Sequence, residues 1–423
     1  MTTGPSRPLP KIRPDPGPAV AAPTSGRGDG VRGSAAIVAV KRIFAAETGN
    51  YFLVLGTTLF LVIFGLMMVL SSSSVESYTA NGDFFNGFVR QVLFAAIGVP
   101  VMLIAARLPV NFWKKWAGRL LLASIVLELL VFVPHIGVSV NGNRNWISVF
   151  GFSAQPSELI KVALVLWLGK SFAGMQDRLD DWRELIRPLI PAGVAIALVA
   201  IGGDIGTTII LSAIVFASLF FAGVKLRILA VPLIAAGLAG ASLSLGSGSR
   251  AARIAALIHG CKTDSDFHGL CWQTVHGWWA LASGGVFGVG LGNSKLKWSW
   301  LPEADNDFIF AIVGEELGLI GAILVLVLFV VLAITFVRVI RARAQSDAFV
   351  RIAIGAVLVW IVGQAFINIA VVLGILPVLG VPLPLISAGG SALVTSLIGI
   401  GIVLSFARQA PNPARQSPRS AVG

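Results

Sequence analysis

The chain concentrates its ionisable residues in one stretch, 294–316, although it otherwise avoids charge. This stretch contains Lys295, Lys297, Glu303, Asp305, Asp307, Glu315 and Glu316. A long apolar run begins at Phe308, so the acids lie where a loop meets a predicted membrane helix. Placing charged groups at such a boundary costs free energy, so by default they indicate a functional site. Carboxylates there can act as general bases, and lysines can neutralise an anionic substrate.

The composition indicates what kind of scaffold positions these residues. The 423 residues are 56% hydrophobic and only 12% charged, with a mean hydropathy of +0.86, whereas soluble domains average about 25% charged residues. The net charge is +12, and the lysines and arginines lie mostly in loops between apolar runs and in the two tails. No basic patch is interleaved with aromatic residues, as nucleic-acid binding would require. We therefore expect an integral membrane protein in contact with membrane lipid and no nucleic-acid partner.

About ten apolar runs approach the ~20 residues that a helix needs to cross the hydrocarbon core. They occupy roughly residues 51–71, 88–106, 118–134, 155–170, 186–202, 206–222, 226–245, 308–337, 350–375 and 390–407. The run at 308–337 is long enough to tilt or break. Lysine and arginine gather in alternate loops and in both tails, so the positive-inside rule predicts cytoplasmic termini. The predicted fold is all-α and polytopic, with a large outward-facing loop, 246–307 (the outer loop), between the seventh and eighth helices.

The predicted organisation has three parts. Residues 1–46 are rich in Pro, Gly, Ala and Arg, which predicts a disordered cytoplasmic tail. Residues 47–408 form the membrane domain, and residues 409–423 form a second cytoplasmic tail.

The outer loop has features of its own. Residues 277–292 are too broken by glycine for a standard span, so this segment is expected at the membrane interface or partly inserted. Four tryptophans suit an aromatic belt at headgroup level: Trp278, Trp279, Trp298 and Trp300. Cys261 and Cys271, the only cysteines, also lie in this loop. An oxidising compartment would allow a disulfide between them, while their spacing is equally compatible with two free thiols.

Motifs spread over nearly the whole membrane domain suggest a family. They are N-G-N-R-N-W-I at 141–147, Q-P-S-E-L-I-K at 155–161, G-D-I-G-T-T at 203–208, W-Q at 272–273, G-L-G-N-S-K-L-K at 290–297, L-P-E-A-D-N-D-F-I-F-A at 301–311, G-E-E-L-G at 314–318, Q-A-F-I-N at 364–368 and the Gly/Pro-rich run 374–391. In this order and spacing they resemble the SEDS (shape, elongation, division and sporulation) family of bacterial membrane glycosyltransferases. The Leu-Pro-Glu-Ala form at 301–304 resembles its FtsW-type, cell-division branch. Ser153 stands where a basic residue is common, which weakens the case for a complete cationic phosphate site.

The resemblance implies a peptidoglycan glycosyltransferase. Its substrate would be lipid II, a disaccharide-pentapeptide on undecaprenyl pyrophosphate, and its product a β-1,4 glycan strand for septal wall synthesis. A class B penicillin-binding protein transpeptidase and other division proteins are the implied partners, and the bacterial cytoplasmic membrane, at the septum, is the implied location. A lipid-precursor flippase or a secondary transporter is the alternative, and a recruiting scaffold is a third. The acids gather at one face and not at the bilayer midplane, where transporters bind their substrates.

Asp307 is the expected general base, because it matches the aspartate to which the family's catalysis is assigned. Its place just before Phe308 also suits the N-cap of a helix. Glu303 is expected to assist Asp307 or to share a divalent cation, Mg²⁺ or Mn²⁺, with it; a solvated loop acid is the alternative. Asp305 is expected to face solvent. No organic cofactor is expected.

A pyrophosphate leaving group requires cations, and the candidates are Arg144, Lys161 and Lys297, followed by Arg253 and Lys295. Snorkelling beside lipid headgroups is the alternative role for such residues. Lys161 follows Glu158 by three residues on a predicted helix, so the two can pair inside the membrane. The expected substrate-binding set is completed by Trp146, Gln155, Ser157, Glu158, Asp204 and Ser387. Asp204, between two glycines, suits a turn equally well.

Three further polar features are expected inside the bundle. At least one of Glu315 and Glu316 must face protein or water, because both fall within the apolar run that begins at Phe308. Gln364 and Asn368 are one helical turn apart, which favours hydrogen bonds to a neighbouring segment. The run 380–391 cannot be regular helix and is expected to form one wall of a groove.

Overall fold

The computed structural model describes residues 48–140, 143–149, 152–230, 234, 271–298, 300–343 and 347–408. These residues belong to one compact unit that begins at Glu47. Most of the predicted seventh span lies outside the described residues, as do Arg253, Cys261 and the segments 1–46 and 409–423.

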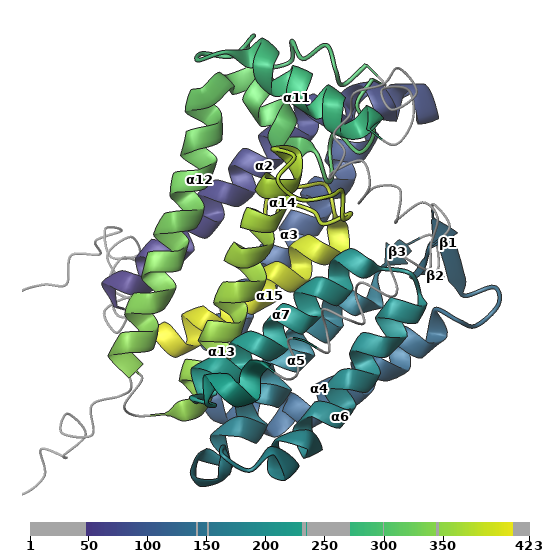
Figure 1. The fold of residues 1–423 in the computed structure, drawn as a ribbon. Coiled ribbons are helices and arrows are strands. Elements are labelled where there is room, and N and C mark those ends of the chain that lie inside the picture. Colours follow the sequence, from purple (N-terminus) through teal and green to yellow (C-terminus); the bar gives the residue numbers. More distant parts are fainter. Residues whose placement is uncertain are drawn as a thin grey trace, which may run out of the picture. The chain divides into compact units, whose positions relative to one another are not determined.

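The described part of the chain is mainly helical (Figure 1). Its α-helices are α2 (Gly49–Asn81), α3 (Asn86–Arg107), α4 (Val110–Leu130), α5 (Pro156–Ala173), α6 (Trp182–Ile201), α7 (Ile205–Ala222), α11 (Trp272–Gly284), α12 (Ile309–Arg343), α13 (Ala348–Leu358), α14 (Gln364–Val372) and α15 (Gly390–Ala407). A π-helical turn, Val359–Gly363, joins α13 to α14, and a short 3-10 turn, Gln176–Arg178, follows α5.

Seven helices in the described residues are long and apolar enough to cross a membrane. They are α2, α3, α6, α7, α12, the continuous α13–α14 helix and α15. α4 and α5 have similar lengths but carry more charge: Lys114, Lys115, Arg119 and Glu128 in α4, and Glu158, Lys161 and Lys170 in α5. The prediction of a polytopic α-helical membrane protein is confirmed.

The segment after α4 departs from the all-α prediction. It forms a small antiparallel sheet with the strand order β1 (Gly137–Val140), β2 (Asn143–Val149) and β3 (Phe152–Ala154). The sequence carried a signal for this sheet, because Asn-Gly, the dipeptide between β1 and β2, favours hairpin turns. The backbone N–H of Arg144 in β2 donates to the carbonyl of Gly202 at the end of α6, 2.8 Å away. The sheet therefore lies against the α6–α7 turn.

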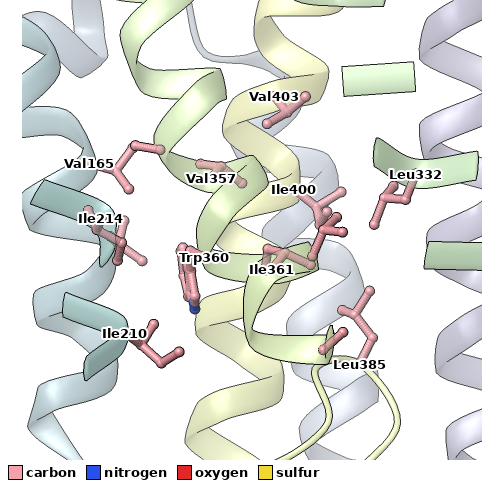
Figure 2. Close-up of a cluster of buried hydrophobic side chains, with 14 of the residues drawn as sticks. Val165, Ile210, Ile214, Leu332, Val357, Trp360, Ile361, Leu385, Ile400 and Val403 are labelled. Atoms are coloured by element: carbon pink, nitrogen blue, oxygen red, sulfur yellow. The ribbon is translucent and has the colours of Figure 1, made fainter. Parts of the chain in front are cut away.

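The core is built around α5 and α13, most of whose residues are buried. Figure 2 shows Trp360 and Ile361 of the π-helical turn between side chains of α7, such as Ile210 and Ile214, and Ile400 of α15. Large apolar side chains elsewhere face the surroundings, as in a membrane bundle, where lipid is as apolar as the interior. The most exposed include Ile63, Leu93, Leu122, Ile190 and Ile201.

The eighth span was predicted to tilt or to break, and a break is present in α12. Gly318 has φ 68° and ψ −165°, which are not helical. The segment after α11 pairs with the backbone around this break: the N–H groups of Val289 and Gly290 donate to the carbonyls of Glu315 and Glu316, and Leu319 N–H donates to Gly285. The backbone groups that the break frees are thus satisfied within the protein, as a membrane environment requires.

Gly318→Ala is expected to destabilise the fold by roughly 2–4 kcal/mol, because a Cβ would be strained at this φ and would overlap the backbone of Val286 and Gly288. Gly193→Ala in α6 is the matched control, since a Cβ at that position meets no atom within 4 Å. Gly193→Ala should leave stability unchanged or raise it by up to about 1 kcal/mol. Thermal unfolding of the detergent-solubilised protein measures both, and equal melting temperatures for the two variants would contradict the prediction.

Candidate active site

Asp307 lies just before α12 and is 9% exposed. The side-chain NH₂ of Asn368 in α14 donates both to the backbone carbonyl of Asp307, at 2.7 Å, and to that of Val381, at 2.8 Å. A Cβ built on Gly380 would lie 3.6 Å from Oδ2 of Asp307, so the carboxylate lies against this glycine. α12 begins at Ile309, which puts Phe308 and not Asp307 at the N-cap position.

The segment 373–389 between α14 and α15 has no regular helix or strand, as predicted for residues 380–389, whereas Gly390 and Ser391 of the predicted run 380–391 begin α15. Hydrogen bonds join this segment to the loop that carries Asp307. The Ser387 hydroxyl donates to the carbonyl of Asn306, 2.7 Å away, and accepts from Leu383 N–H. Ala388 N–H donates to the carbonyl of Asp305, 2.8 Å away. Ser387, a predicted substrate-binding residue, therefore holds two backbone segments together.

A buried polar group surrounds the start of α5; we call it the α5 polar cluster. It contains Gln155, Glu158, Lys161, Asp204, Gln364 and Thr395. The predicted pair is present: Lys161 Nζ lies 2.7 Å from Glu158 Oε1, and Lys161 is only 2% exposed. Lys161 also donates to Gln364 Oε1, 3.3 Å away, and lies over the ring of Trp360. Ser157 is buried beside them, and among the described residues its hydroxyl has no hydrogen-bond partner.

Asp204 joins this cluster from the α6–α7 turn. One carboxylate oxygen caps α7 by accepting from Thr207 N–H at 2.8 Å, and the other accepts from Gln155 Nε2 at 2.6 Å. Burial raises the pKa of Asp204, while its hydrogen bonds to Thr207 and the charge of Lys161 oppose this rise. Asp204 therefore has the predicted role in the turn, as the N-cap of α7, and its carboxylate also belongs to the α5 polar cluster through its bond to Gln155.

α14 connects the α5 polar cluster to Asp307. Gln364 contacts Lys161 and donates to the carbonyl of Pro382, whereas Asn368 contacts the backbone of Asp307 and Val381. Both amides are buried, and the predicted hydrogen bonds to neighbouring segments are confirmed. The start of α7 reaches the same segment, because a Cβ on Gly206 would overlap the carbonyl of Leu379. The α5 polar cluster thus reaches residues 379–382 through Gln364 and the start of α7, and Asp307 reaches the same residues through Asn368.

A second buried group fixes the outer loop; we call it the loop anchor. It consists of Ser71 in α2, Ser294 and Lys297 in the outer loop, and Glu315 and Glu316 in α12. Glu316 accepts from the Ser71 hydroxyl at 2.6 Å and lies 3.4 Å from Lys297 Nζ, which also donates to Gly292 O at 2.7 Å. Glu315 accepts from the hydroxyl of Ser294 and from Lys295 N–H. Both glutamates face protein, and Lys297 is engaged in holding the loop.

The remaining predicted residues lie around these groups. Arg144 is half-buried in β2, next to the turn that carries Asp204, and makes no ion pair with the described residues. Trp146 is half-buried and pairs with Val138 of β1. Glu303 is exposed, has φ 55°, and accepts a hydrogen bond from Asn306 at 3.3 Å. Arg253 lies outside the described residues.

Two acids behave differently from what the sequence suggested. Asp305 was expected to face solvent, but it is half-buried, and its backbone carbonyl accepts from Ala388 N–H of the segment between α14 and α15. Glu128 in α4 was not singled out, yet it is 1% exposed, and its Oε2 has no hydrogen-bond partner among the described residues. Its charge interacts with that of Asp204. An acid inside the apolar run 118–134 was the signal that could have found it.

Asp305 should make stability pH-dependent. Burial, followed by the charges of Glu76 and Glu303, raises the pKa of Asp305 from 3.8 to about 7. Since the folded state then binds the proton more tightly than the unfolded state, the stability that this proton contributes is lost as pH rises from about 4 through 7. Asp305→Asn should reduce the fall in melting temperature between pH 5 and pH 8. Identical falls for wild type and variant would show that Asp305 does not titrate in this window.

A protein-held metal site does not fit the described residues. They contain no group of three or more His, Cys, Asp or Glu side chains that could hold a metal ion. Asp307 and Glu303 lie on one loop, but no third ligand accompanies them. Cys271, at the start of α11, is disulfide-bonded, while Cys261 lies outside the described residues.

Comparisons with known proteins agree with this architecture. Residues 51–412 match the profile of the FtsW/RodA/SpoVE cell cycle proteins. The chain is 40% identical to the probable peptidoglycan glycosyltransferase FtsW of Mycobacterium tuberculosis, covering 86% of this chain and 68% of that protein. It is 38% identical to the corresponding Geobacter sp. protein, covering 84% of this chain and 96% of that one.

Solved structures share the fold. A chain of a peptidoglycan synthase complex, described as coordinating polymerization and crosslinking, superposes with a TM-score of 0.68 at 22% identity, covering 86% of this chain and 98% of that one. The rod shape determining protein RodA of Thermus thermophilus gives a TM-score of 0.61 at 23% identity, covering 86% and 97%. With its multi-pass helical fold and its ordered motifs, the chain belongs to the FtsW/RodA/SpoVE family of cell cycle proteins, the SEDS family that the sequence resembled.

Proposed function

We propose that this protein is a peptidoglycan glycosyltransferase that polymerises lipid II into β-1,4 glycan strands. The relatives at 34–40% identity carry the name peptidoglycan glycosyltransferase FtsW. The observation that carries the proposal is the setting of Asp307: a nearly buried acid at the end of the outer loop, whose backbone is bonded by Asn368 of α14, the helix whose Gln364 contacts the buried cation Lys161. An acid and a cation linked through one helix suit a sugar transfer with an anionic leaving group.

Asp307 acts as the general base in the proposed reaction. The hydroxyl oxygen of the acceptor sugar forms a bond to the anomeric carbon of the donor. The bond from that carbon to the pyrophosphate oxygen breaks, and its electron pair stays on the pyrophosphate. The hydroxyl proton passes to the Asp307 carboxylate. A single displacement on an α-linked donor gives a β-linked product, so the reaction inverts the anomeric centre without a covalent enzyme intermediate.

Arg144 and Lys161 are the proposed cations for the pyrophosphate. Lys161 is desolvated and held by Glu158 and Gln364, so its charge is screened little by water. Arg144 lies on the strand beside Asp204 and offers a bidentate fork for phosphate oxygens. The contacts of Lys297 support a positioning role for the outer loop instead. A divalent cation would need ligands from substrate and water, because the described donor set does not hold one alone, and no step here uses it.

A class B penicillin-binding protein is the proposed partner, and the division septum is the proposed location. The structural neighbour described as coordinating polymerization and crosslinking supports a polymerase that works with a transpeptidase. The relatives named FtsW support a role in division.

The test is polymerisation of fluorescent lipid II by the purified protein in liposomes, with the partner transpeptidase added. Glycan strands that lysozyme digests are the expected product. Labelled lipid II that reaches the opposite leaflet without forming polymer would support a flippase and would overturn the glycosyltransferase proposal.

A further inference from the structure

Four aromatic rings contact one another on the predicted outer face; we call them the aromatic platform. Trp272, His276 and Trp279 come from α11, and Trp300 comes from the outer loop. The rings of Trp272 and Trp300 lie within 20° of parallel, with centroids 6.0 Å apart. His276 lies 3.9 Å from Trp272 and 4.6 Å from Trp279, centroid to centroid. The four side chains therefore form one packed group and not separate surface indoles.

Part of the aromatic platform is exposed. His276 is buried, but Trp279 and Trp300 are each 53% exposed. The rings of Trp272 and His276 lie within 20° of parallel to that of Trp300, with centroids 6.0 Å and 6.1 Å from it. These contacts within the platform therefore leave about half of Trp300 exposed.

The orientation of the platform is fixed relative to the loop that carries Asp307. The indole N–H of Trp272 donates to the carbonyl of Trp300 at 2.8 Å, and Gln273 Nε2 donates to that of Pro302 at 3.1 Å. A Cβ on Gly277 would lie 2.9 Å from the ring of Phe308, so α11 packs directly on the residue after Asp307. Figure 1 shows α11 lying alongside the start of α12. The open rings thus sit at a set position beside the proposed base.

We propose that the aromatic platform is a carbohydrate subsite, which binds hexosamine units of the glycan strand adjacent to the reacting sugar. This inference rests on the proposed glycosyltransferase function. The faces of aromatic rings are electronegative, and the C–H groups on a hexosamine face are weakly electropositive, so the two surfaces stack. Rigid indoles also lose little conformational entropy on binding. A headgroup belt needs no fixed ring orientation, whereas here two hydrogen bonds set the plane of the platform relative to the loop of Glu303 and Asp307.

The platform is tested by the binding of a peptide-free β-1,4-linked oligosaccharide of alternating N-acetylglucosamine and N-acetylmuramic acid. Binding to the purified full-length protein is followed by saturation-transfer NMR. Trp279→Leu and Trp300→Leu keep apolar bulk but remove the flat face, and each is expected to weaken binding about five- to tenfold, the size of one aromatic stacking contact. Trp298→Leu is the matched control, because Trp298 is 62% exposed on the same loop and is not part of the platform; its binding should change less than twofold.

Polymerisation gives a second readout. With lipid II, the two platform variants should make shorter strands than wild type and Trp298→Leu. If wild type polymerises lipid II but the platform variants bind the oligosaccharide and set strand length as wild type does, the subsite is wrong while the proposed function stands. If all three tryptophan variants reconstitute poorly into liposomes yet bind oligosaccharide normally, the rings are a membrane belt and the subsite is wrong. If wild type makes no polymer, the glycosyltransferase proposal fails, whatever the binding experiment shows.

Discussion

Asp307→Asn is expected to lower the rate of lipid II polymerisation by roughly 10²–10⁴-fold, the range for loss of a general acid–base group. The amide has nearly the size of the carboxylate, but it cannot accept the proton of the attacking hydroxyl. The loop should stay in place, because Asn368 bonds the backbone carbonyl of residue 307 and not its side chain. Glycan formation in liposomes, with the partner transpeptidase present, measures the rate.

Asp83→Asn provides the control for this experiment. Asp83 is exposed in the turn between α2 and α3, and the same chemical change there should leave polymerisation within about twofold of wild type. Melting temperatures of the two variants close to wild type would show that Asp307→Asn acts on chemistry. If Asp307→Asn polymerises normally, the base lies elsewhere, and Glu303, on the same loop, is the next residue to replace.

Lys161→Met should be the most destabilising single change in the α5 polar cluster. It leaves Glu158, which is also buried, without its cation, and loss of one partner of a buried ion pair costs about 3–5 kcal/mol. Gln364 loses a donor as well, although it keeps its bond to Pro382. Thermal unfolding in detergent should show a large fall in melting temperature.

The double variant Glu158→Leu/Lys161→Met separates folding from chemistry. Replacing a whole buried pair by apolar residues of similar volume is often neutral or stabilising, so the double variant should recover most of the lost stability. Polymerisation should stay low, because the proposed pyrophosphate cation is still missing. Recovery of both stability and polymerisation would assign Lys161 a structural role only and leave Arg144 as the proposed cation.

Several features could be predicted because they depend on neighbouring residues. The apolar runs indicate membrane helices, since length and composition alone determine whether a helix can span the bilayer. The pair of Glu158 and Lys161 follows from their spacing on one helix. The break in α12 follows from an apolar run too long for one straight span. The order of the motifs was enough to indicate the family.

Other features were decided by contacts between segments far apart in the chain. Lys297 meets Glu316 of α12 and Ser71 of α2, and no pattern around Lys297 in the sequence encodes these contacts. Asp305 is half-buried in a loop that bonds to Ala388, more than 80 residues later, and no local pattern around Asp305 encodes that contact. A sequence pattern shows how one helix or loop divides polar from apolar residues. Which carboxylate meets which cation depends on how separate helices pack, and only the tertiary structure contains that information.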